Sequence, residues 1–186
     1  MNRKTKLLSY TVMFAAISYA AFAFLKINIP LPGGGNVAIH TANAVVVLSS
    51  WLIGPVYGGL SGAVGLSIAD LLDPLYVVSA PKTFFLKFMI GFISGSLASG
   101  MGLKHETDPK KITKITALSA IAGLGFNVIF EPVISYLYRR FILRTGAEAA
   151  AILSAWLGGV TAFNAVICVI LSVLLYKALS RHFRSI

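Results

Sequence analysis

The chain has 186 residues, of which 57% are hydrophobic and 12% are charged, and its mean hydropathy is +0.83. A soluble domain averages about 25% charged residues, so the composition excludes a soluble protein and a soluble domain on a single anchor. The formal net charge of +10 does not indicate nucleic-acid binding, because basic residues fill the short loops of membrane proteins and set their orientation. We predict an all-α integral membrane protein with one domain over residues 1–186.

Six hydrophobic segments predict six transmembrane helices, since a spanning helix needs about 20 apolar residues. The predicted helices cover residues 8–25, 40–54, 57–72, 82–101, 112–138 and 149–177. The second and third are short and only Gly54 and Pro55 separate them, which predicts a tight hairpin. Residues 26–39 contain two Pro and three Gly, so we expect an irregular loop that is either a plain connector or a lid over a site.

Six spans place both termini on one side of the membrane, and the positive-inside rule identifies that side as the cytoplasm. The inner set holds ten basic residues: Arg3, Lys4, Lys6, Lys104, Lys110, Lys111, Lys114, Lys177, Arg181 and Arg184. The outer set holds six: Lys26, Lys82, Lys87, Arg139, Arg140 and Arg144.

Small residues recur at intervals of three or four positions, a pattern that lets helices approach closely. The pattern comprises Ala16 and Ala20 in the first helix, Gly58, Gly62, Gly65 and Ala69 in the third, and Gly91 and Gly95 in the fourth. Either internal packing or a partner subunit accounts for the alanines of the first helix.

Polar residues predict inward-facing stripes in the last two helices. They are Ser119, Asn127, Glu131 and Ser135 in the fifth helix, and Thr161, Asn164, Cys168 and Ser172 in the sixth. With the predicted topology, the charged and amide side chains gather in the outer half of the membrane, where charges are costly and mark function. This asymmetry predicts a pocket that opens outward and is closed below. Asp70 and Lys87 form either a buried ion pair or contacts to a ligand.

Two other functions and a metal site have weaker support in the sequence. Gly59-Leu60-Ser61-Gly62 matches the GxSG of rhomboid-type intramembrane serine proteases, but no His falls within a late helix to activate the Ser. His40 has no second His or Cys at ligand spacing, so no metal or cofactor is predicted. An autonomous secondary carrier needs a site that both sides of the membrane can reach, and one-sided polar groups disfavour it.

A series of motifs resembles a known family. The motifs are IP-x-PGG followed by H-x-x-N-A, then GP-x-YG-x-x-x-G-x-x-G-x-x-x-ADLL, then P-x-TF-x-x-K-x-x-x-G, over residues 28–100. In this order they resemble the substrate-capture (S) subunits of energy-coupling-factor (ECF) vitamin transporters, in the branch of the riboflavin-type and hydroxymethylpyrimidine/pyridoxine-type subunits. Where that branch is expected to have Gly-Asp after the His, this chain has Thr41, Ala42 and Asn43, which leaves the ligand class open.

The resemblance implies a six-helix subunit of the bacterial cell membrane that binds a vitamin on the outer side and is not an enzyme. It would deliver the vitamin together with a transmembrane T subunit and two ATP-binding subunits, docking through Ala16 and Ala20. The implied ligand-binding residues are Asn36, His40, Asn43, Tyr76, Lys82, Lys87, Trp156 and Asn164. Aromatic faces with a few hydrogen-bonding groups suit a small hydroxylated ring, with pyridoxine or hydroxymethylpyrimidine as the best candidates.

Overall fold

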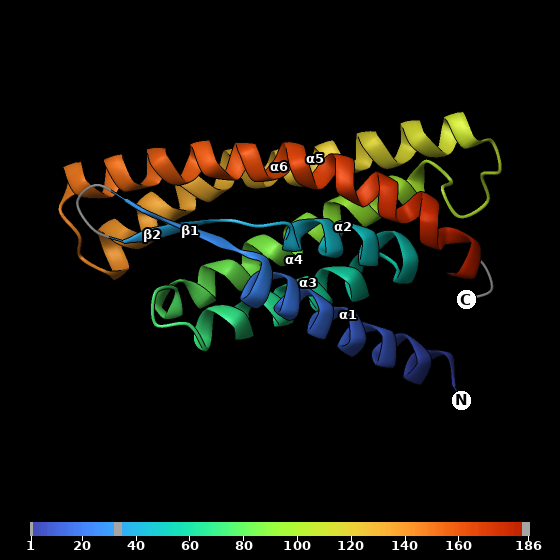
Figure 1. Ribbon diagram of the computed structural model, residues 1–186, viewed down its shortest axis with the longest axis horizontal. Coiled ribbons are helices and arrows are strands. Elements are labelled where there is room, and N and C mark those ends of the chain that lie inside the picture. The colour runs from blue at the N-terminus through green and yellow to red at the C-terminus, as the bar shows by residue number, and fades with distance from the viewer. Residues whose placement is uncertain (1, 32–34, 184–186) are drawn as a thin grey trace.

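The computed structural model describes residues 2–31 and 35–183 and is largely helical (Figure 1). Its elements in chain order are α1 (Arg3–Leu25), β1 (Ile27–Pro30), β2 (Asn36–Ile39), α2 (Ala42–Ile53), α3 (Pro55–Leu71), η1 (Val77–Ser79), α4 (Ala80–Gly100), α5 (Pro109–Leu137), η2 (Tyr138–Ile142) and α6 (Ala147–Phe183). The six predicted helices are present, with ends that differ by a few residues from the predicted ones. Gly33 and Gly34 of the motif and Arg184 of the basic tail lie outside the described residues.

Local sequence signals explain where several helices begin. The backbone of Gly54 has φ +93°, a conformation that side chains disfavour, and Pro55 then opens α3 with a φ already suited to a helix. The predicted tight turn between α2 and α3 is therefore confirmed. At the start of α5 the side chain of Asp108 accepts a hydrogen bond of 2.9 Å from the backbone N–H of Lys110, which satisfies one free donor of the first turn.

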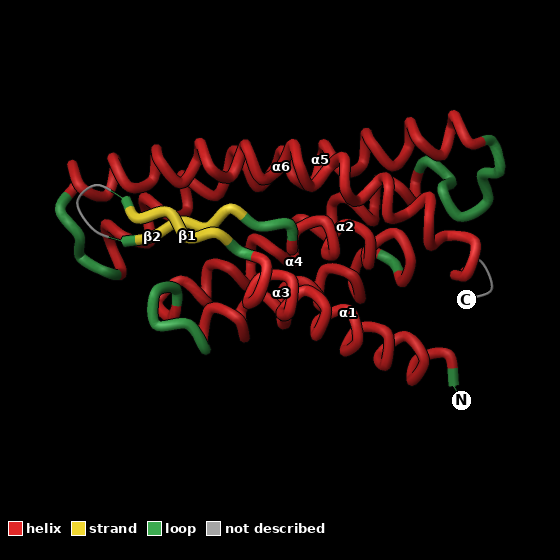
Figure 2. Tube along the Cα trace, viewed as in Figure 1, coloured by secondary structure: helices red, strands yellow, loops and turns green. Residues whose placement is uncertain are grey.

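The prediction of an irregular loop over residues 26–39 is wrong, because this segment contains two short antiparallel strands (Figure 2). Ile27 pairs with Ile39 and Pro30 pairs with Asn36. Pro30 is tolerated because it lies at the end of an edge strand, where its missing N–H costs no ladder bond. The β1–β2 hairpin lies beside α6, and the side chain of Val37 packs with Leu153 of that helix.

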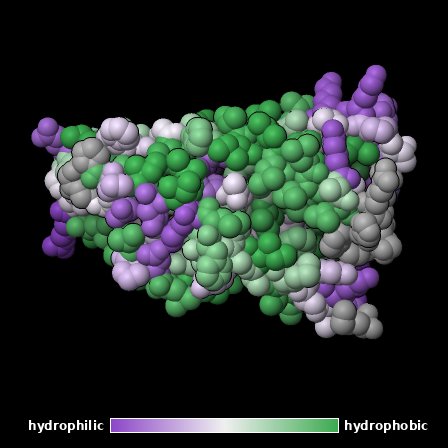
Figure 3. All heavy atoms as spheres, in the orientation of Figure 1, coloured by the Kyte–Doolittle hydropathy of each residue, from purple (hydrophilic) through white to green (hydrophobic). Residues whose placement is uncertain are grey.

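Four helical segments are long and apolar enough to cross a membrane, namely residues 3–25, 77–100, 109–142 and 147–180. Helices α2 and α3, with 12 and 17 residues, are shorter than this. On the face shown in Figure 3, hydrophobic residues cover the middle of the molecule and hydrophilic residues lie mostly towards the two ends, as expected of a protein embedded in a bilayer.

The start of α1 and the last turns of α6 lie at the same end of the molecule, together with the loop between α4 and α5 (Figure 1). The β1–β2 hairpin and the loops that follow α3 and α5 lie at the opposite end. We call these the terminal end and the hairpin end.

The small-residue stripes of α3 and α4 provide close contacts between helices, as predicted. A Cβ on Gly91 would lie 2.7 Å from the Cα of Gly59, which is too close for any side chain. A Cβ on Gly65 would meet the backbone of Ala15 in α1 in the same way. The glycines therefore allow α1, α3 and α4 to pack backbone against backbone.

The polar stripes of the last two helices face the interior, which confirms their prediction. The buried members are Ser119, Asn127, Glu131 and Ser135 of α5, and Thr161, Asn164, Cys168 and Ser172 of α6. The core around them is apolar and centres on α2, whose Ala42, Ala44 and Val46 have no exposed surface.

Candidate functional site

A cavity of about 80 Å³ lies in the hairpin end, where β2, α3, α4, α5 and α6 converge. Six of the eight predicted ligand-binding residues line it: Asn36, His40, Tyr76, Lys82, Lys87 and Asn164. The elements that supply them lie far apart in the sequence. The predicted gathering of polar groups at one end of the bundle is thus present in the folded chain.

Glu131 is the centre of a buried charge cluster in this cavity. Its Oε1 accepts a hydrogen bond of 2.5 Å from Lys82 Nζ, and its Oε2 lies 3.9 Å from Lys87 Nζ. The three side chains are each less than 10% exposed. A buried carboxylate needs such partners, because an unpaired charge in an apolar interior costs several kcal/mol, on the order of 3–5.

Asp70 and Lys87 do not form the direct ion pair that the sequence left open. Asp70 Oδ2 accepts a hydrogen bond of 2.6 Å from Thr83 Oγ1, and within the described chain the carboxylate within ion-pair distance of Lys87 is Glu131. Thr83 lies one helical turn before Lys87 in α4. Its hydroxyl, and not the Lys87 ammonium, contacts the Asp70 carboxylate of α3. All three side chains line the cavity.

Asn164 fixes the backbone that leads into α2. Its Oδ1 accepts a hydrogen bond from the backbone N–H of His40 at 3.2 Å, and its Nδ2 donates to the carbonyl of Ala38 at 2.9 Å. The imidazole of His40 meets the ring of Phe22 edge to face, with 5.0 Å between centroids. Its Nδ1 has no hydrogen-bond partner among the described residues although it is buried, so it is free to bond a ligand.

A second ion pair lies beside Phe22, a residue that lines the cavity. Lys26 Nζ, just before β1, pairs with Asp73, which follows α3, and lies 4.5 Å from the ring centre of Phe22. Tyr76 Oη donates to Asn28 Oδ1 at 2.8 Å. Partial burial raises the pKa of Asp73, but bonds from Lys26 and the N–H of Leu75 outweigh it and lower the pKa below its usual range. These contacts hold the hairpin against the loop between α3 and α4.

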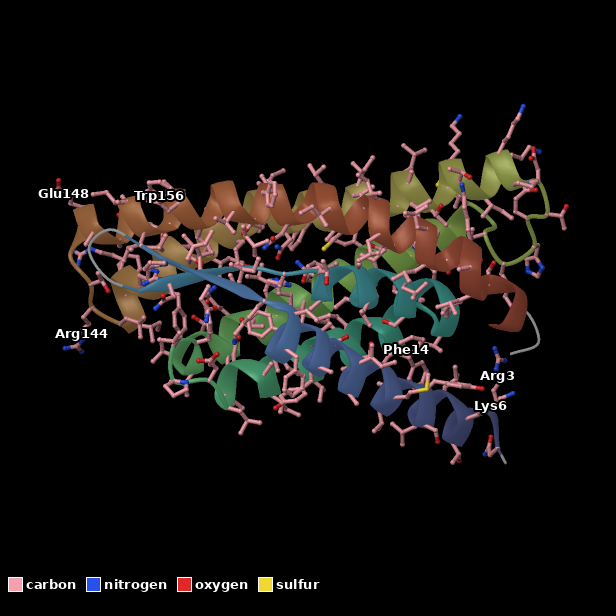
Figure 4. All side chains as sticks on the ribbon, in the orientation of Figure 1. Arg3, Lys6, Phe14, Arg144, Glu148 and Trp156 are labelled. Carbon is pink, nitrogen blue, oxygen red and sulfur yellow. The ribbon has the colours of Figure 1, made fainter. Side chains whose placement is uncertain are left out.

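Two predicted ligand-binding residues do not reach the cavity. Trp156 is 51% exposed and borders a shallow apolar groove on the outer surface of α6 with Ile39 and Phe163. Figure 4 shows its side chain on the face of α6 that points away from the bundle. The reason is helical phase: Leu157 lines the cavity, and Trp156 is rotated by about 100° from it.

Asn43 is buried inside α2, and its Oδ1 has no partner among the described residues. Asn43 is close in sequence to the lining residue His40, but it does not line the cavity. Its position inside the helix turns the side chain into the core, where the stripe of α6 lies.

Sequence reasoning assigned no role in the site to several lining residues, among them Phe22, Arg139 and Leu157. A signal existed for Arg139, because it lies eight residues after Glu131, close to two helical turns, on a continuous helical segment. No signal existed for Phe22, which reaches the cavity only because α1 ends against the hairpin.

Ser61, which the sequence matched to a protease motif, is buried between helices. Ser61 Oγ donates to the carbonyl of Gly58 at 2.8 Å and lies 2.9 Å from Ser49 Oγ, deep in helix packing.

Ala16 is exposed on α1, whereas its neighbour Ala15 is buried against α3. Internal packing therefore does not explain Ala16. Within the described residues, no three His, Cys, Asp or Glu side chains come together as metal ligands would.

Comparisons with known proteins agree with this architecture. The family described as "ECF-type riboflavin transporter, S component" matches residues 2–181. A solved structure described as "Structure and mechanism of the S component of a bacterial ECF transporter" shares the fold, with a TM-score of 0.61, 17% identity, and coverage of 97% of this chain and 98% of that one. No curated protein matches the sequence at a significant level. The chain therefore belongs to the family of ECF-type riboflavin transporter S components and is a membrane transport subunit.

Proposed function

We propose that this subunit captures a small water-soluble vitamin or vitamin precursor in an outward-facing pocket and delivers it with a T subunit and two ATP-binding subunits. All six helices cross or enter the bacterial cell membrane, with both termini in the cytoplasm. The observation that carries this proposal is the cavity at the hairpin end, where charged and amide side chains from six elements meet in an otherwise apolar bundle. Such a constellation is costly unless it serves a ligand.

The chemistry of the cavity suits a compact ring with hydroxyl substituents. Lys82, Lys87 and Arg139 supply donors, whereas Asp70 and Glu131 supply acceptors. A hydroxyl group both donates and accepts, so it can insert between such groups and replace part of their mutual bonding. The rings of Phe22 and Tyr76 offer apolar surface beside them.

The size of the cavity bears on the ligand. At about 80 Å³ it is far below the 300–1,000 Å³, roughly, that pockets for drug-sized ligands provide. The cavity must therefore widen to admit a vitamin. A single-ring compound such as pyridoxine or hydroxymethylpyrimidine requires less expansion than a three-ring flavin.

Riboflavin is the second candidate, favoured by the description of the matching family. Isothermal titration of the purified subunit with pyridoxine, hydroxymethylpyrimidine and riboflavin separates the candidates. We expect tight binding of a single-ring compound and at least about tenfold weaker binding of the other classes. Tight binding of riboflavin alone would refute the single-ring assignment and keep the capture function.

The alternative function is an autonomous secondary carrier. Uptake of the bound vitamin into vesicles that contain only this subunit tests it directly. We expect no uptake until the T subunit and the ATP-binding subunits are added together with ATP. ATP-independent uptake by the subunit alone would overturn the proposal.

A further inference from the structure

A second cavity, of about 170 Å³, lies at the terminal end, far from the vitamin site. The first turns of α1, the turn between α2 and α3, and the last turn of α4 with its following loop enclose it. Three basic side chains border it: Arg3, Lys6 and Lys104. Figure 4 shows Arg3 and Lys6 together at this end of the molecule.

These three cations have no carboxylate partner within the part of the chain that the structure describes. Only two of the six acidic residues, Glu106 and Asp108, are near this end, and neither lines the cavity. Glu106 accepts bonds from the backbone N–H groups of Thr107 and Asp108, and Asp108 caps α5. The cavity thus presents positive charge that the neighbouring acids do not neutralise.

The walls below the cations are apolar. Leu7, Trp51, Leu52 and Leu103 line the same cavity. The indole of Trp51 is held in place, because its Nε1 donates to Ser119 Oγ at 3.0 Å and its ring meets Tyr176 edge to face at 5.5 Å. A molecule that fits must therefore join an anionic head to an apolar body.

We propose that this cavity binds the phosphodiester head group of an anionic phospholipid, with the upper part of an acyl chain against Trp51 and Leu52. Basic pockets between membrane helices recognise anionic lipid in this way, and the cytoplasmic leaflet is the anionic one. A free phosphate compound would satisfy the cations but would leave the apolar walls uncovered. The inference rests on the proposed orientation, in which the terminal end faces the cytoplasm, and not on the vitamin site.

The two tryptophans of the chain allow a direct test, because Trp51 borders this cavity and Trp156 does not. In a Trp156→Phe background, Trp51 is the single indole fluorophore. The protein is placed in phosphatidylcholine vesicles, and a brominated lipid is added in increasing fractions. In one series this lipid is brominated phosphatidylglycerol, and in the other it is brominated phosphatidylcholine. The bromine atoms lie near the head group and quench nearby indoles. We expect half-maximal quenching at a fraction of brominated phosphatidylglycerol at least about fivefold lower than that of brominated phosphatidylcholine, the factor that one basic residue contributes.

Matched charge changes test the three cations. The triple variant Arg3→Gln, Lys6→Gln, Lys104→Gln should lose the preference for brominated phosphatidylglycerol. The control triple variant Lys4→Gln, Lys110→Gln, Lys114→Gln should keep this preference. The control set removes the same charge from exposed positions at the same end that do not line the cavity. A third variant, Arg3→Lys, Lys6→Arg, Lys104→Arg, preserves charge and should also keep the preference.

Two outcomes would overturn the proposal: equal quenching by both lipids, or loss of the preference in the control set. Equal quenching by both lipids together with binding of soluble glycerol phosphate would assign the cavity to a free phosphate compound. Vitamin titrations on the same variants should be unchanged, so a failure of the lipid site and a failure of the vitamin site are distinguishable.

Discussion

Among single residues, Asn164 fixes the backbone beside the cavity through its side-chain amide. Both ends of its side chain are bonded to backbone groups of the segment 38–40. The amide therefore sets where His40 presents its imidazole, and it lines the cavity as well. The bonds to this segment are a role that the sequence did not predict, whereas ligand contact by Asn164 stays a prediction.

Asn164→Ala should weaken vitamin binding by about tenfold or more and lower stability by about 1–3 kcal/mol. The cost in stability arises because the N–H of His40 and the carbonyl of Ala38 both lose their partner. Titration calorimetry and thermal unfolding in detergent measure the two effects. Asn164→Asp keeps the acceptor for His40 and should retain more affinity than the alanine variant. Unchanged affinity in Asn164→Ala would contradict the assigned site.

Glu131→Gln should destabilise the protein by about 3–5 kcal/mol, because it leaves two buried ammonium groups without a counter-charge. The second change Lys82→Met removes one of these charges and should restore part of the loss. Chemical unfolding of the wild type, the single variants and the double variant forms the required cycle. Additive effects in the double variant would show that Glu131 and Lys82 are not coupled.

Six of the eight residues that the sequence predicts as ligand contacts line the cavity, but their bonding could not be predicted. Asp70, Lys87 and Glu131 attract attention because charges are rare in apolar segments. Which lysine meets which carboxylate depends on the rotation of α3, α4 and α5 about their axes, and no local pattern encodes that rotation. The position of Trp156 outside the cavity has the same cause, since one residue along a helix turns the side chain by about 100°.

At the scale of the elements, the helices follow from apolar length and from their caps, so their number and bounds were predictable. The β1–β2 hairpin was not, because each strand has four residues and the Pro and Gly content of the segment favours a loop. Its formation depends on packing against α6, through Val37 and Leu153, and on the bonds from Asn164. Tertiary contacts therefore decide its structure.

The contact between α1 and α3 tests the role of the small residues. Gly65→Ala should destabilise by about 1–3 kcal/mol, because the new methyl group meets the backbone of Ala15 and α1 must shift. Gly125→Ala is the control: no atom lies within 4 Å of the added Cβ, so the better helix propensity should leave stability equal or raise it by about 1 kcal/mol. Thermal unfolding in the same detergent compares them. Equal loss in both variants would exclude close packing as the cause.

At the scale of the whole molecule, the two ends differ in the way a capture subunit requires. The hairpin end holds four of the six acidic residues and a cavity of mixed charge, whereas the terminal end is strongly basic. Between them the described core contains buried hydroxyl and amide groups but no buried charged residue. We therefore expect delivery of a captured vitamin to need a movement of the whole subunit or a partner.

The exposed face of α1 is the candidate surface for that partner. Ala16→Trp should abolish ATP-driven uptake by the assembled transporter and leave vitamin affinity of the isolated subunit unchanged, because Ala16 points outward and far from the cavity. Val166→Trp, on an exposed face of α6, is the matched control and should transport normally. Uptake and affinity are measured on the same preparations. Normal uptake by Ala16→Trp would exclude this face as the docking surface.

The orientation in the membrane determines whether the cavity can capture a solute from outside, and labelling of single cysteines measures it. Cys168 is the single native cysteine and is buried, so Cys168→Ser gives a suitable background. In that background, Thr145→Cys reports on the loop before α6 and His105→Cys reports on the loop between α4 and α5. The excess of basic residues at the terminal end predicts that this end is cytoplasmic. A membrane-impermeant maleimide should therefore label position 145 in intact cells and position 105 only after permeabilisation. The reverse pattern would place the vitamin cavity on the cytoplasmic side, where it could not serve import.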